Sequence, residues 1–522
     1  MGPTHLLQAA ISRAKAGITF LSSLSAQFTK LASKELPRTD HARAILLEPT
    51  ATSEGASPLE QTRPDPVVTN DKYTLSDLDM ISPNSLVAFY LIYKLEATHD
   101  IHIVTETLQQ GLKRAAEQLL LLAAKIRFDS SGKPLKRMVP GSLEAKICTF
   151  ESWEHKSYDQ LAAASFPPDD FDQAQLIPVE IYDNTDERPV LLVQLNFIPG
   201  GLIFGLGFNH VANDGVSMNL ALTLISKCSK AYMERTSELR SSFDYQRAAF
   251  AANPAALALP KEQLSAHVRD YRIVEITGTL NDRNVPKPTR ALRGVKGLIY
   301  RIEGEAVQRL KDSCSPLGGT EYISTYDCIV GMLWRSVVRV RTELNPHLKT
   351  SNSRLLHPVD LRHRPESGIS EKYLGNAVAV ANAGPVQVVD LLGTKGLSLA
   401  ASSVRHSIEN TTLASIGDAI ALGTKMASTE NLIFKPGGGL QEANFMLTTW
   451  YFMNTAAYDF GIGPPESVRC SPVLTAGFML LFPDCRRQKD SRVYDLYITL
   501  SEAEHRLLKE DEEFRSWFSI LQ

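Results

Sequence analysis

Residues 190–215 read VLLVQLNFIPGGLIFGLGFNHVANDG, and this stretch decides the fold of the first half of the chain. Apolar side chains recur at every second position in 191–197 and again in 202–208, with a Pro-Gly-Gly turn between the two runs. This period of two on either side of a glycine turn predicts a β-hairpin. Apolar residues then recur at helical spacing from Met218 to Tyr232, so a helix should follow the hairpin.

Three other segments carry helix signals. Apolar residues repeat at intervals of three and four over 104–126, which predicts one long amphipathic helix. Ser324 with Asp327, and Ser501 with Glu504, have the spacing of residues that cap the first turn of a helix. The second of these pairs should open the final helix of the chain.

Strands are predicted at 474–482 and 493–500. Since strands and helices do not alternate strictly along the chain, the predicted fold class is α+β. A chain of 522 residues is long enough for two large domains, each with its own core. The predicted divisions are a partly flexible N-terminal extension at 1–70, a first domain at 71–250, a crossover at 251–290 and a second domain at 291–522.

The composition limits the classes of function. A net charge of −3 supplies no broad basic surface, so nucleic-acid binding is not expected. Six scattered cysteines without a CxxC pair fit a reducing compartment. No apolar run reaches the roughly 20 residues of a membrane-spanning helix. We therefore expect a cytoplasmic protein without a transmembrane segment; a basic, amphipathic, acid-free start before Glu35 leaves an organellar location as the alternative.

His210 is the candidate catalytic residue of the hairpin region. Acyl transfer to an alcohol needs a base for the hydroxyl proton, and imidazole, with an ordinary pKa of about 6.5, suits this near neutral pH. Asp214 either holds the surroundings of the histidine or caps the following helix, and Gly215 permits a tight turn. The alternative is a structural histidine at a strand end. No metal is expected, because no HExxH pattern or cysteine partner accompanies His210.

Several further motifs follow the HxxxDG element of His210, Asp214 and Gly215. DFGIG occupies residues 459–463 near the C-terminus. Between the two motifs lie STYD at 324–327 with LWR at 333–335, DLRHR at 360–364, YLGNAV at 373–378 and TTW at 448–450. This set, in this order, resembles the BAHD family of acyltransferases and in particular its fungal secondary-metabolite branch. The resemblance runs from about residue 75 to the C-terminus, and Ile462 stands where the family has Trp.

The resemblance implies two chloramphenicol-acetyltransferase-like domains, with mixed sheets flanked by helices and a channel between them. The first domain carries HxxxD and the second the DFGxG-like motif. His210 would lie in mid-channel as the general base of a transfer without an acyl-enzyme. Structural support of the site is implied for Asp214, Gly215, Arg362, Asp459, Gly461 and Gly463, with Arg362 as the partner of Asp214. Channel walls or oxyanion donors are implied at Thr448, Thr449 and Trp450.

The same resemblance implies the ligands. Acyl-CoA, by default acetyl-CoA, would be a co-substrate, and no cofactor would be bound permanently. The acceptor would be the hydroxyl of a small secondary metabolite, and the protein would be a monomer. Lys425, Lys435 and Arg364 are candidates for the CoA phosphates.

Two alternatives remain beside this interpretation. A condensation-type catalyst would take its acyl group from a carrier protein, but such domains usually carry HHxxxDG and Asn209 precedes His210 here. An inactive binding relative would be expected to lose the histidine, which is present.

Overall fold

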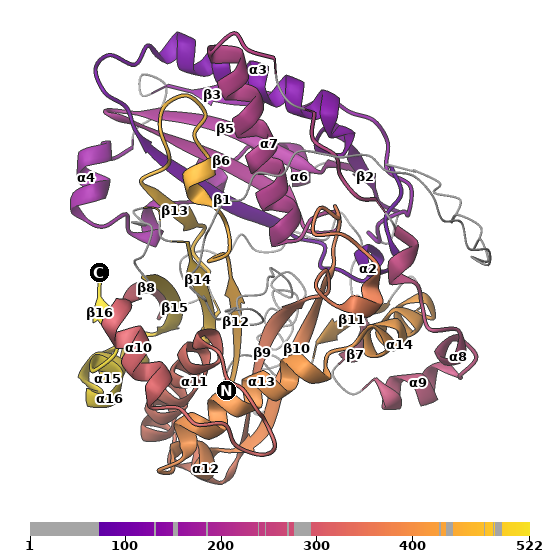
Figure 1. The fold of residues 1–522 in the computed structure, drawn as a ribbon, viewed down its shortest axis with the longest axis vertical. Helices are drawn as coiled ribbons and strands as arrows, with labels where there is room; N and C mark the ends of the chain where they lie inside the picture. Colours follow the sequence, from indigo (N-terminus) through magenta and orange to yellow (C-terminus); the bar gives the residue numbers. More distant parts are fainter. Residues whose placement is uncertain are drawn as a thin grey trace, which may run out of the picture.

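The computed structural model describes residues 73–521, apart from 130–131, 150–154, 184–185, 238–239, 246, 269–270, 276–293, 427–429, 435–441, 474, 484 and 486–492. The predicted extension at 1–70 and Lys435 lie outside these residues. The described chain is built around a five-stranded and a seven-stranded β-sheet, which form the upper and lower halves of Figure 1.

The five-stranded sheet carries the predicted hairpin. Its order is β13 (Ser467–Cys470), β1 (Leu86–Lys94), β6 (Gly201–Asn209), β5 (Leu191–Ile198) and β3 (Ala145–Cys148). Strands β5 and β6 pair antiparallel from Leu191 opposite Phe208 to Ile198 opposite Gly201, which confirms the hairpin. Gly205 is required in β6 because a Cβ there would stand 2.0 Å from the carbonyl oxygen of Leu176.

Helices cover both faces of this sheet. Helices α3 (Ile101–Gln118) and α7 (Gly215–Met233) lie side by side on one face (Figure 1). Helices α4 (Tyr158–Ala163) and α5 (Gln173–Leu176) pack against the other face. Helix α7 begins at Gly215, directly after the turn that contains His210, so the sheet and the helix together position that turn.

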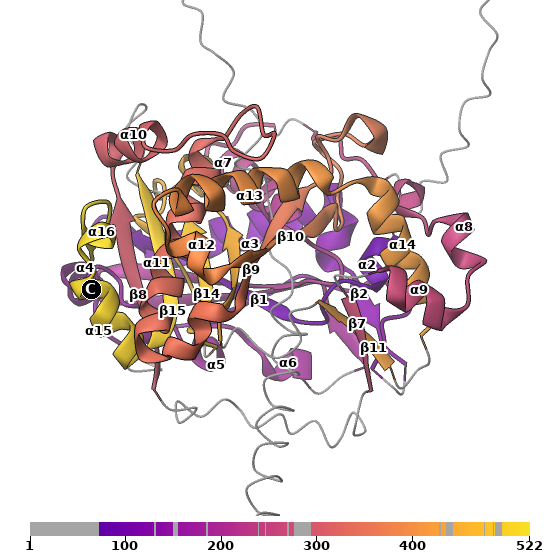
Figure 2. The same ribbon diagram turned by 90° about the horizontal axis from the view of Figure 1, so that it is seen from below.

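The seven-stranded sheet is the frame of the second half. Its order is β10 (Val378–Gln387), β9 (Asn352–Asp360), β12 (Asn444–Thr449), β14 (Phe478–Phe482), β15 (Tyr494–Ser501), β8 (Val295–Ile302) and β16 (Ser519–Ile520). Strand β12 runs parallel to β9 and β14 while the other pairs are antiparallel, so the sheet is mixed. Helices α11 (Thr325–Leu344) and α13 (Gly396–Asn410) cover its outer face (Figures 1 and 2).

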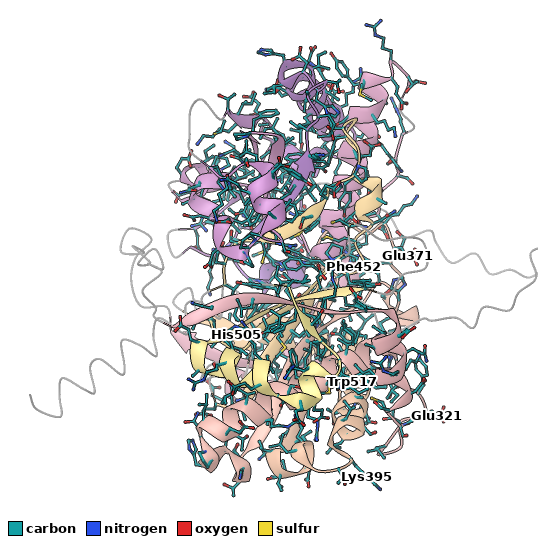
Figure 3. All side chains as sticks on the ribbon, turned by 90° about the vertical axis from the view of Figure 1, so that its left-hand side faces the viewer. Glu321, Glu371, Lys395, Phe452, His505 and Trp517 are labelled. Carbon is teal, nitrogen blue, oxygen red and sulfur yellow. The ribbon has the colours of Figure 1, made fainter. Side chains whose placement is uncertain are left out.

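The inner face of the seven-stranded sheet packs against the first half. Alternate residues of its strands, such as Leu356, Met446 and Leu480, belong to the same buried cluster as α3, α7 and the hairpin. Figure 3 shows the two halves stacked, with Phe452 at the level where they meet. Strand β13 crosses this boundary, because it lies between β12 and β14 of the second half in sequence but pairs with β1 of the first sheet.

The remaining elements are short and lie around the two sheets. They are α2 (Asp77–Met80), α6 (Glu180–Asp183), α8 (Pro254–Leu257), α9 (Lys261–His267), α10 (Gly304–Asp312), α12 (Val388–Leu392), α14 (Leu413–Thr424), α15 (Glu502–Glu510), α16 (Glu512–Arg515), β2 (Lys125–Arg127), β4 (Glu187–Pro189), β7 (Tyr271–Glu275) and β11 (Glu430–Phe434). Part of the predicted crossover therefore has its own structure, α8, α9 and β7. The predicted domain boundaries stay predictions.

The predicted helix signals have mixed outcomes. Capping boxes at Ser324 and Ser501 are confirmed. The prediction of one helix over 104–126 is wrong beyond Gln118, where α3 ends and a 3-10 turn and strand β2 follow. Apolar residues keep the same spacing there because the side chains of the turn and the strand face the same core. The strand predicted at 474–482 begins only at Phe478. The prediction that Ser501 and Glu504 open the final helix is wrong, because the short helix α16 follows α15.

Candidate active site

His210 lies in the turn between β6 and α7, facing the second half. Its backbone N–H donates to the carbonyl of Ser85 (2.9 Å), and its carbonyl accepts from the side-chain amide of Asn376 (2.9 Å). Ser85 precedes β1 and Asn376 precedes β10, so both halves hold the turn. The residue is only 1% exposed.

Burial sets the protonation state of His210. Removal of the ring from water lowers the pKa of His210 to about 4, while hydrogen bonding and the nearby Asp214 carboxylate act in the opposite direction. The imidazole is therefore neutral at neutral pH. A neutral ring has a free lone pair on one nitrogen, which a general base requires.

Asp214 caps α7 and also forms an ion pair across the two halves. Its Oδ1 accepts from the backbone N–H of Ser217 (2.9 Å), which is the helix cap. The Arg362 guanidinium donates to both carboxylate oxygens, at 2.8 and 3.0 Å, and the N–H of Ala377 donates to Oδ2 (2.9 Å). The two readings of Asp214 are thus compatible, since one carboxylate has room for both sets of donors.

Arg362 is fixed by further contacts on its own side of the boundary. It donates to Asp360 (3.1 Å) and to the carbonyls of Tyr373 (3.0 Å) and Gly375 (3.0 Å). The Arg362 and Asp214 side chains are 1% and 0% exposed. A buried ion pair with this many additional hydrogen bonds is strongly destabilised when one partner is removed.

Two residues near His210 were not among the predicted site residues. Asn376 bonds the carbonyls of His210 and Val211, and Asp79 on α2 bonds Asn376. Asn376 belongs to the YLGNAV motif, but nothing in that motif says which side chain faces the histidine. Asp79 forms a capping box with Ser76, and that local pattern indicates only a helix start.

The TTW segment at the end of β12 divides between two faces of its sheet. Trp450 belongs to the buried cluster shared with the first half, and so does Met446 of β12. Thr448 is two residues after Met446 on the same strand, so its side chain points to the same face of the sheet. Thr449 points to the opposite face, where neighbouring Leu447 packs with α11. Thr448 and Trp450 are therefore the two of the three that face the first half.

Both of these side chains have unsatisfied polar atoms. Thr448 Oγ1 and Trp450 Nε1 are buried and have no hydrogen-bond partner among the described residues. A buried donor without a partner costs about 1–3 kcal/mol, so such groups call for a functional explanation. The Trp450 ring packs edge-on against Phe89 of β1, with ring centroids 5.0 Å apart, which orients the indole.

The DFGIG segment holds a turn against α7. Asp459 Oδ1 accepts from the backbone N–H groups of Gly461 and Gly463, both at 3.0 Å, and Oδ2 accepts from Lys230 of α7 (3.0 Å). Gly461 has a φ of +97°, and a Cβ there would stand 2.6 Å from Met233 Sδ. The segment thus supports the C-terminal end of α7, the helix that Asp214 caps at its start.

A cavity of about 600 Å³ lies in the second half, at the edge of the seven-stranded sheet. It is bounded by β10, α13, α14 and the 317–320 loop, and its lining includes Val380, Asn382, Ser403, His406 and Asn410. His210 is not part of its lining, so the opening predicted at His210 stays a prediction.

Neither of the described candidates for the CoA phosphates lines this cavity. Arg364 donates to the carbonyl of Ile408 in α13, and Lys425 follows the end of α14. Among the described residues, no group of three or more His, Cys, Asp or Glu is arranged to hold a metal ion. Within the same residues, no helix has the length and hydropathy to cross a membrane.

Known proteins share the architecture. TRI101 of F. graminearum, solved with Coenzyme A and Deoxynivalenol, superimposes with a TM-score of 0.70 at 19% identity, covering 86% of this chain and 99% of that one. Vinorine synthase gives a TM-score of 0.55 at 16% identity, covering 88% and 96%. These likenesses confirm the predicted fold of two chloramphenicol-acetyltransferase-like halves with mixed sheets flanked by helices.

Sequence comparison agrees with the fold. Trichothecene 3-O-acetyltransferase TRI101 of Fusarium sporotrichioides is 23% identical over 469 residues, covering 84% of this chain and 96% of that protein. Acyltransferase BOA11 of Botryotinia fuckeliana is 26% identical over 58% of this chain and 68% of its own length. A model described as the Transferase family matches residues 60–515. Because that model spans most of the chain, the protein belongs to the Transferase family of acyltransferases, the BAHD-type family that its motifs predict.

Proposed function

We propose that this acyltransferase moves an acyl group, acetyl by default, from coenzyme A to a hydroxyl of a small secondary metabolite, with His210 as general base. The observation that carries the proposal is the position of the neutral His210 ring, in a turn that side chains of both halves hold by hydrogen bonds and an ion pair. The named activity of the relatives, 3-O-acetyl transfer to trichothecenes, supports this class of acceptor.

The chemistry follows from the groups at the boundary between the halves. A ring nitrogen of His210 takes the proton of the acceptor hydroxyl while the hydroxyl oxygen attacks the thioester carbonyl carbon. The carbonyl oxygen becomes an oxyanion, and Thr448 Oγ1 and Trp450 Nε1 are two buried donors with capacity to stabilise it. Collapse of the intermediate breaks the carbon–sulfur bond, and the CoA thiolate recovers the proton from the imidazolium.

Access to His210 is part of this proposal. Because the residue is 1% exposed, neighbouring side chains must move before two substrates can reach the ring. The boundary between the halves is the place for this movement, since the side chains there are largely apolar and belong to different sheets.

The cavity beside β10 is assigned to the CoA part of the donor. Its volume of about 600 Å³ is that of a ligand pocket, and hydroxyl and amide groups line it. Val380 in its lining is four residues from Asn376, which is roughly 13 Å along an extended strand. The cavity is thus near enough for a long ligand to reach the His210 turn.

Steric blockage of the cavity tests this assignment. His406→Trp places a bulky ring at the exposed edge of the cavity and should raise KM for acetyl-CoA with little change in kcat. Glu409→Trp is the matched control, because Glu409 is exposed on the same helix outside the lining. Equal KM values for the two variants would remove the cavity from the donor site.

The reaction itself is tested with purified protein, free acetyl-CoA and a panel of hydroxylated fungal metabolites. We expect thiol release that depends on the acceptor, and a product heavier by one acetyl group in mass spectrometry. Transfer from a carrier-bound acyl group but not from free acyl-CoA would instead indicate the condensation-type activity. No transfer from either donor would favour an inactive relative.

Oligomeric state and location complete the proposal. We expect a monomer in the cytoplasm, with an organellar location as the alternative because of the basic segment before Glu35. Light scattering on the purified full chain and microscopy of a C-terminal fluorescent fusion check the two expectations.

A further inference from the structure

We propose that Asp79 is a positioning residue for His210, acting through Asn376. This inference rests on the proposed role of His210 as the base. Asp79 lies on α2, ahead of the first strand and far from the HxxxDG and DFGIG motifs in sequence. It would explain how Asn376 of the second half is held in the orientation that bonds the histidine turn.

Asp79 is completely buried, and hydrogen bonds reach both of its oxygens. Its Oδ1 accepts from the backbone N–H (2.8 Å) and the side-chain amide (2.9 Å) of Asn376. Its Oδ2 accepts from the N–H of Ser76 (2.7 Å) and from the Arg247 guanidinium (3.3 Å). The exposed fraction of Asp79 is 0%, so its charge depends on these donors for stabilisation.

Asn376 carries the effect of Asp79 to the histidine. The amide nitrogen that bonds Asp79 also lies 2.9 Å from the carbonyl oxygen of His210 and 3.0 Å from that of Val211. All three of these oxygens can only accept hydrogen bonds, because an ionised carboxylate and backbone carbonyls have no proton to give. Asp79 therefore favours the amide orientation in which nitrogen, and not oxygen, faces the histidine turn.

The contact differs from the Asp214–Arg362 ion pair in what it holds, although the two meet at the neighbouring residues Asn376 and Ala377. Asp214 and Arg362 bond the start of α7, after the histidine, whereas Asn376 bonds the carbonyl of His210 itself. Loss of Asp79 leaves the ion pair of Asp214 in place but allows the Asn376 amide to turn over. An amide oxygen would then oppose the His210 carbonyl, and the turn would move.

A small movement of this turn is enough to affect the rate. A displacement of about 1 Å in a reacting group can cost on the order of 10²-fold in rate. Binding of acyl-CoA should change little, because Asp79 has no place in the lining of the cavity. The expected signature is a loss in kcat without a matching change in KM.

The test compares Asp79→Asn with Asp77→Asn in the full chain. Asp77 lies on the same helix, but its carboxylate is partly exposed and pairs with Lys136 (2.5 Å), so the control removes the same charge without touching Asn376. We expect Asp79→Asn to lower kcat on the order of 10- to 100-fold, with KM for acetyl-CoA nearly unchanged. Asp77→Asn should match the wild type in kcat and KM.

The pH profile of kcat/KM separates positioning from general stability. A displaced, better solvated His210 ring should have a higher pKa, so the acidic limb should move upward in Asp79→Asn and not in Asp77→Asn. Asn376→Ser is the second variant, because it removes the bridging amide while Asp79 keeps Ser76 and Arg247. The same loss in kcat and the same shift of the limb are expected for it.

Two outcomes would overturn the inference. In the first, Asp79→Asn and Asn376→Ser lose activity only in proportion to their unfolded fraction, and the acidic limb of the kcat/KM profile does not move. In the second, neither variant folds, which would give Asp79 a role in stability alone. His210→Ala is measured in parallel. If that variant keeps full activity, the proposed function itself fails; if it is inactive while Asp79→Asn behaves as wild type, only the inference about Asp79 fails.

Discussion

The Arg362 guanidinium donates hydrogen bonds to both carboxylate oxygens of Asp214 across the boundary between the two halves, at 2.8 and 3.0 Å. The two residues are 148 positions apart in sequence, and both are buried. Since Asp214 begins the helix that follows His210, this ion pair ties the position of the candidate base to the packing of one half on the other.

Removal of the arginine should destabilise the protein and the site together. Arg362→Met leaves a buried carboxylate without its charged partner, which costs about 3–5 kcal/mol in free energy of unfolding. Arg362→Lys should recover only part of this, because an ammonium cannot donate to both oxygens in the same plane. Urea unfolding measures the loss. Stability equal to wild type in Arg362→Met would show that the pair contributes nothing to the folded state.

Trp450→Phe should lower kcat while it preserves packing. The substitution removes Nε1 but keeps an aromatic ring against Phe89, so we expect a loss on the order of 10²-fold if the indole donates to the oxyanion. Trp334→Phe is the control, because Trp334 Nε1 donates to Ser353 (2.7 Å) within the outer cluster of the second half. That variant should lose stability and not intrinsic kcat. An unchanged kcat in Trp450→Phe would exclude the indole as a donor.

Gly461→Ala should act through folding alone. A side chain at a φ of +97° is strained by about 1–3 kcal/mol, and the added Cβ meets the sulfur of Met233. We expect a lower melting temperature and normal activity per folded molecule. Gly304→Ala is the matched control, since a Cβ there meets nothing within 4 Å. A kcat loss in the fully folded Gly461→Ala protein would assign this turn a part in the chemistry.

Buried histidines should weaken the protein in acid. Burial lowers the pKa of His210 to about 4, of His357 to about 3 and of His505 to about 4, against about 6.5 in an unfolded chain. As the pH falls from about 6.5 toward 4, the unfolded chain binds protons that the folded chain does not. The free energy of unfolding is therefore highest above about pH 6.5. Below that pH it falls by up to about 1.4 kcal/mol per pH unit for each histidine.

One buried carboxyl opposes this trend. Burial raises the pKa of Asp327 to about 6, so as the pH falls the folded chain binds this proton before the unfolded chain does. This uptake offsets the loss of stability caused by roughly one buried histidine. Urea unfolding at several pH values measures the net slope. His505→Gln should reduce the slope by about one proton, and a stability that rises as the pH falls over this range would contradict the account.

Local patterns predicted the parts of the fold that depend on neighbours in sequence. The hairpin that ends at His210 was readable because its two strands alternate around one turn, and the capping boxes at Ser324 and Ser501 are local by nature. The same kind of pattern misled in 104–126, where side chains of a helix, a turn and a strand all face one core. The place of β13 beside β1 depends on pairing over hundreds of residues, which no local pattern specifies.

The candidate site divides in the same way. The family resemblance pointed to Arg362 as the partner of Asp214, and the structure brings the two together. Asp79 and Asn376 are 297 positions apart, and neither stands in a pattern that indicates the other. The burial of His210, and with it the lowered pKa, depends on packing between the halves and could not be read from the residues around it.

The most direct test of His210 as the base is the single-turnover rate of acetyl transfer by His210→Gln, with His363→Gln as the control on an exposed histidine of the DLRHR segment. Glutamine keeps a polar side chain in the turn but cannot accept and return a proton. The account predicts a rate lower than wild type by on the order of 10²–10⁴-fold, with acetyl-CoA binding retained and His363→Gln unaffected. A folded His210→Gln protein that transfers acetyl groups at the wild-type rate would contradict it.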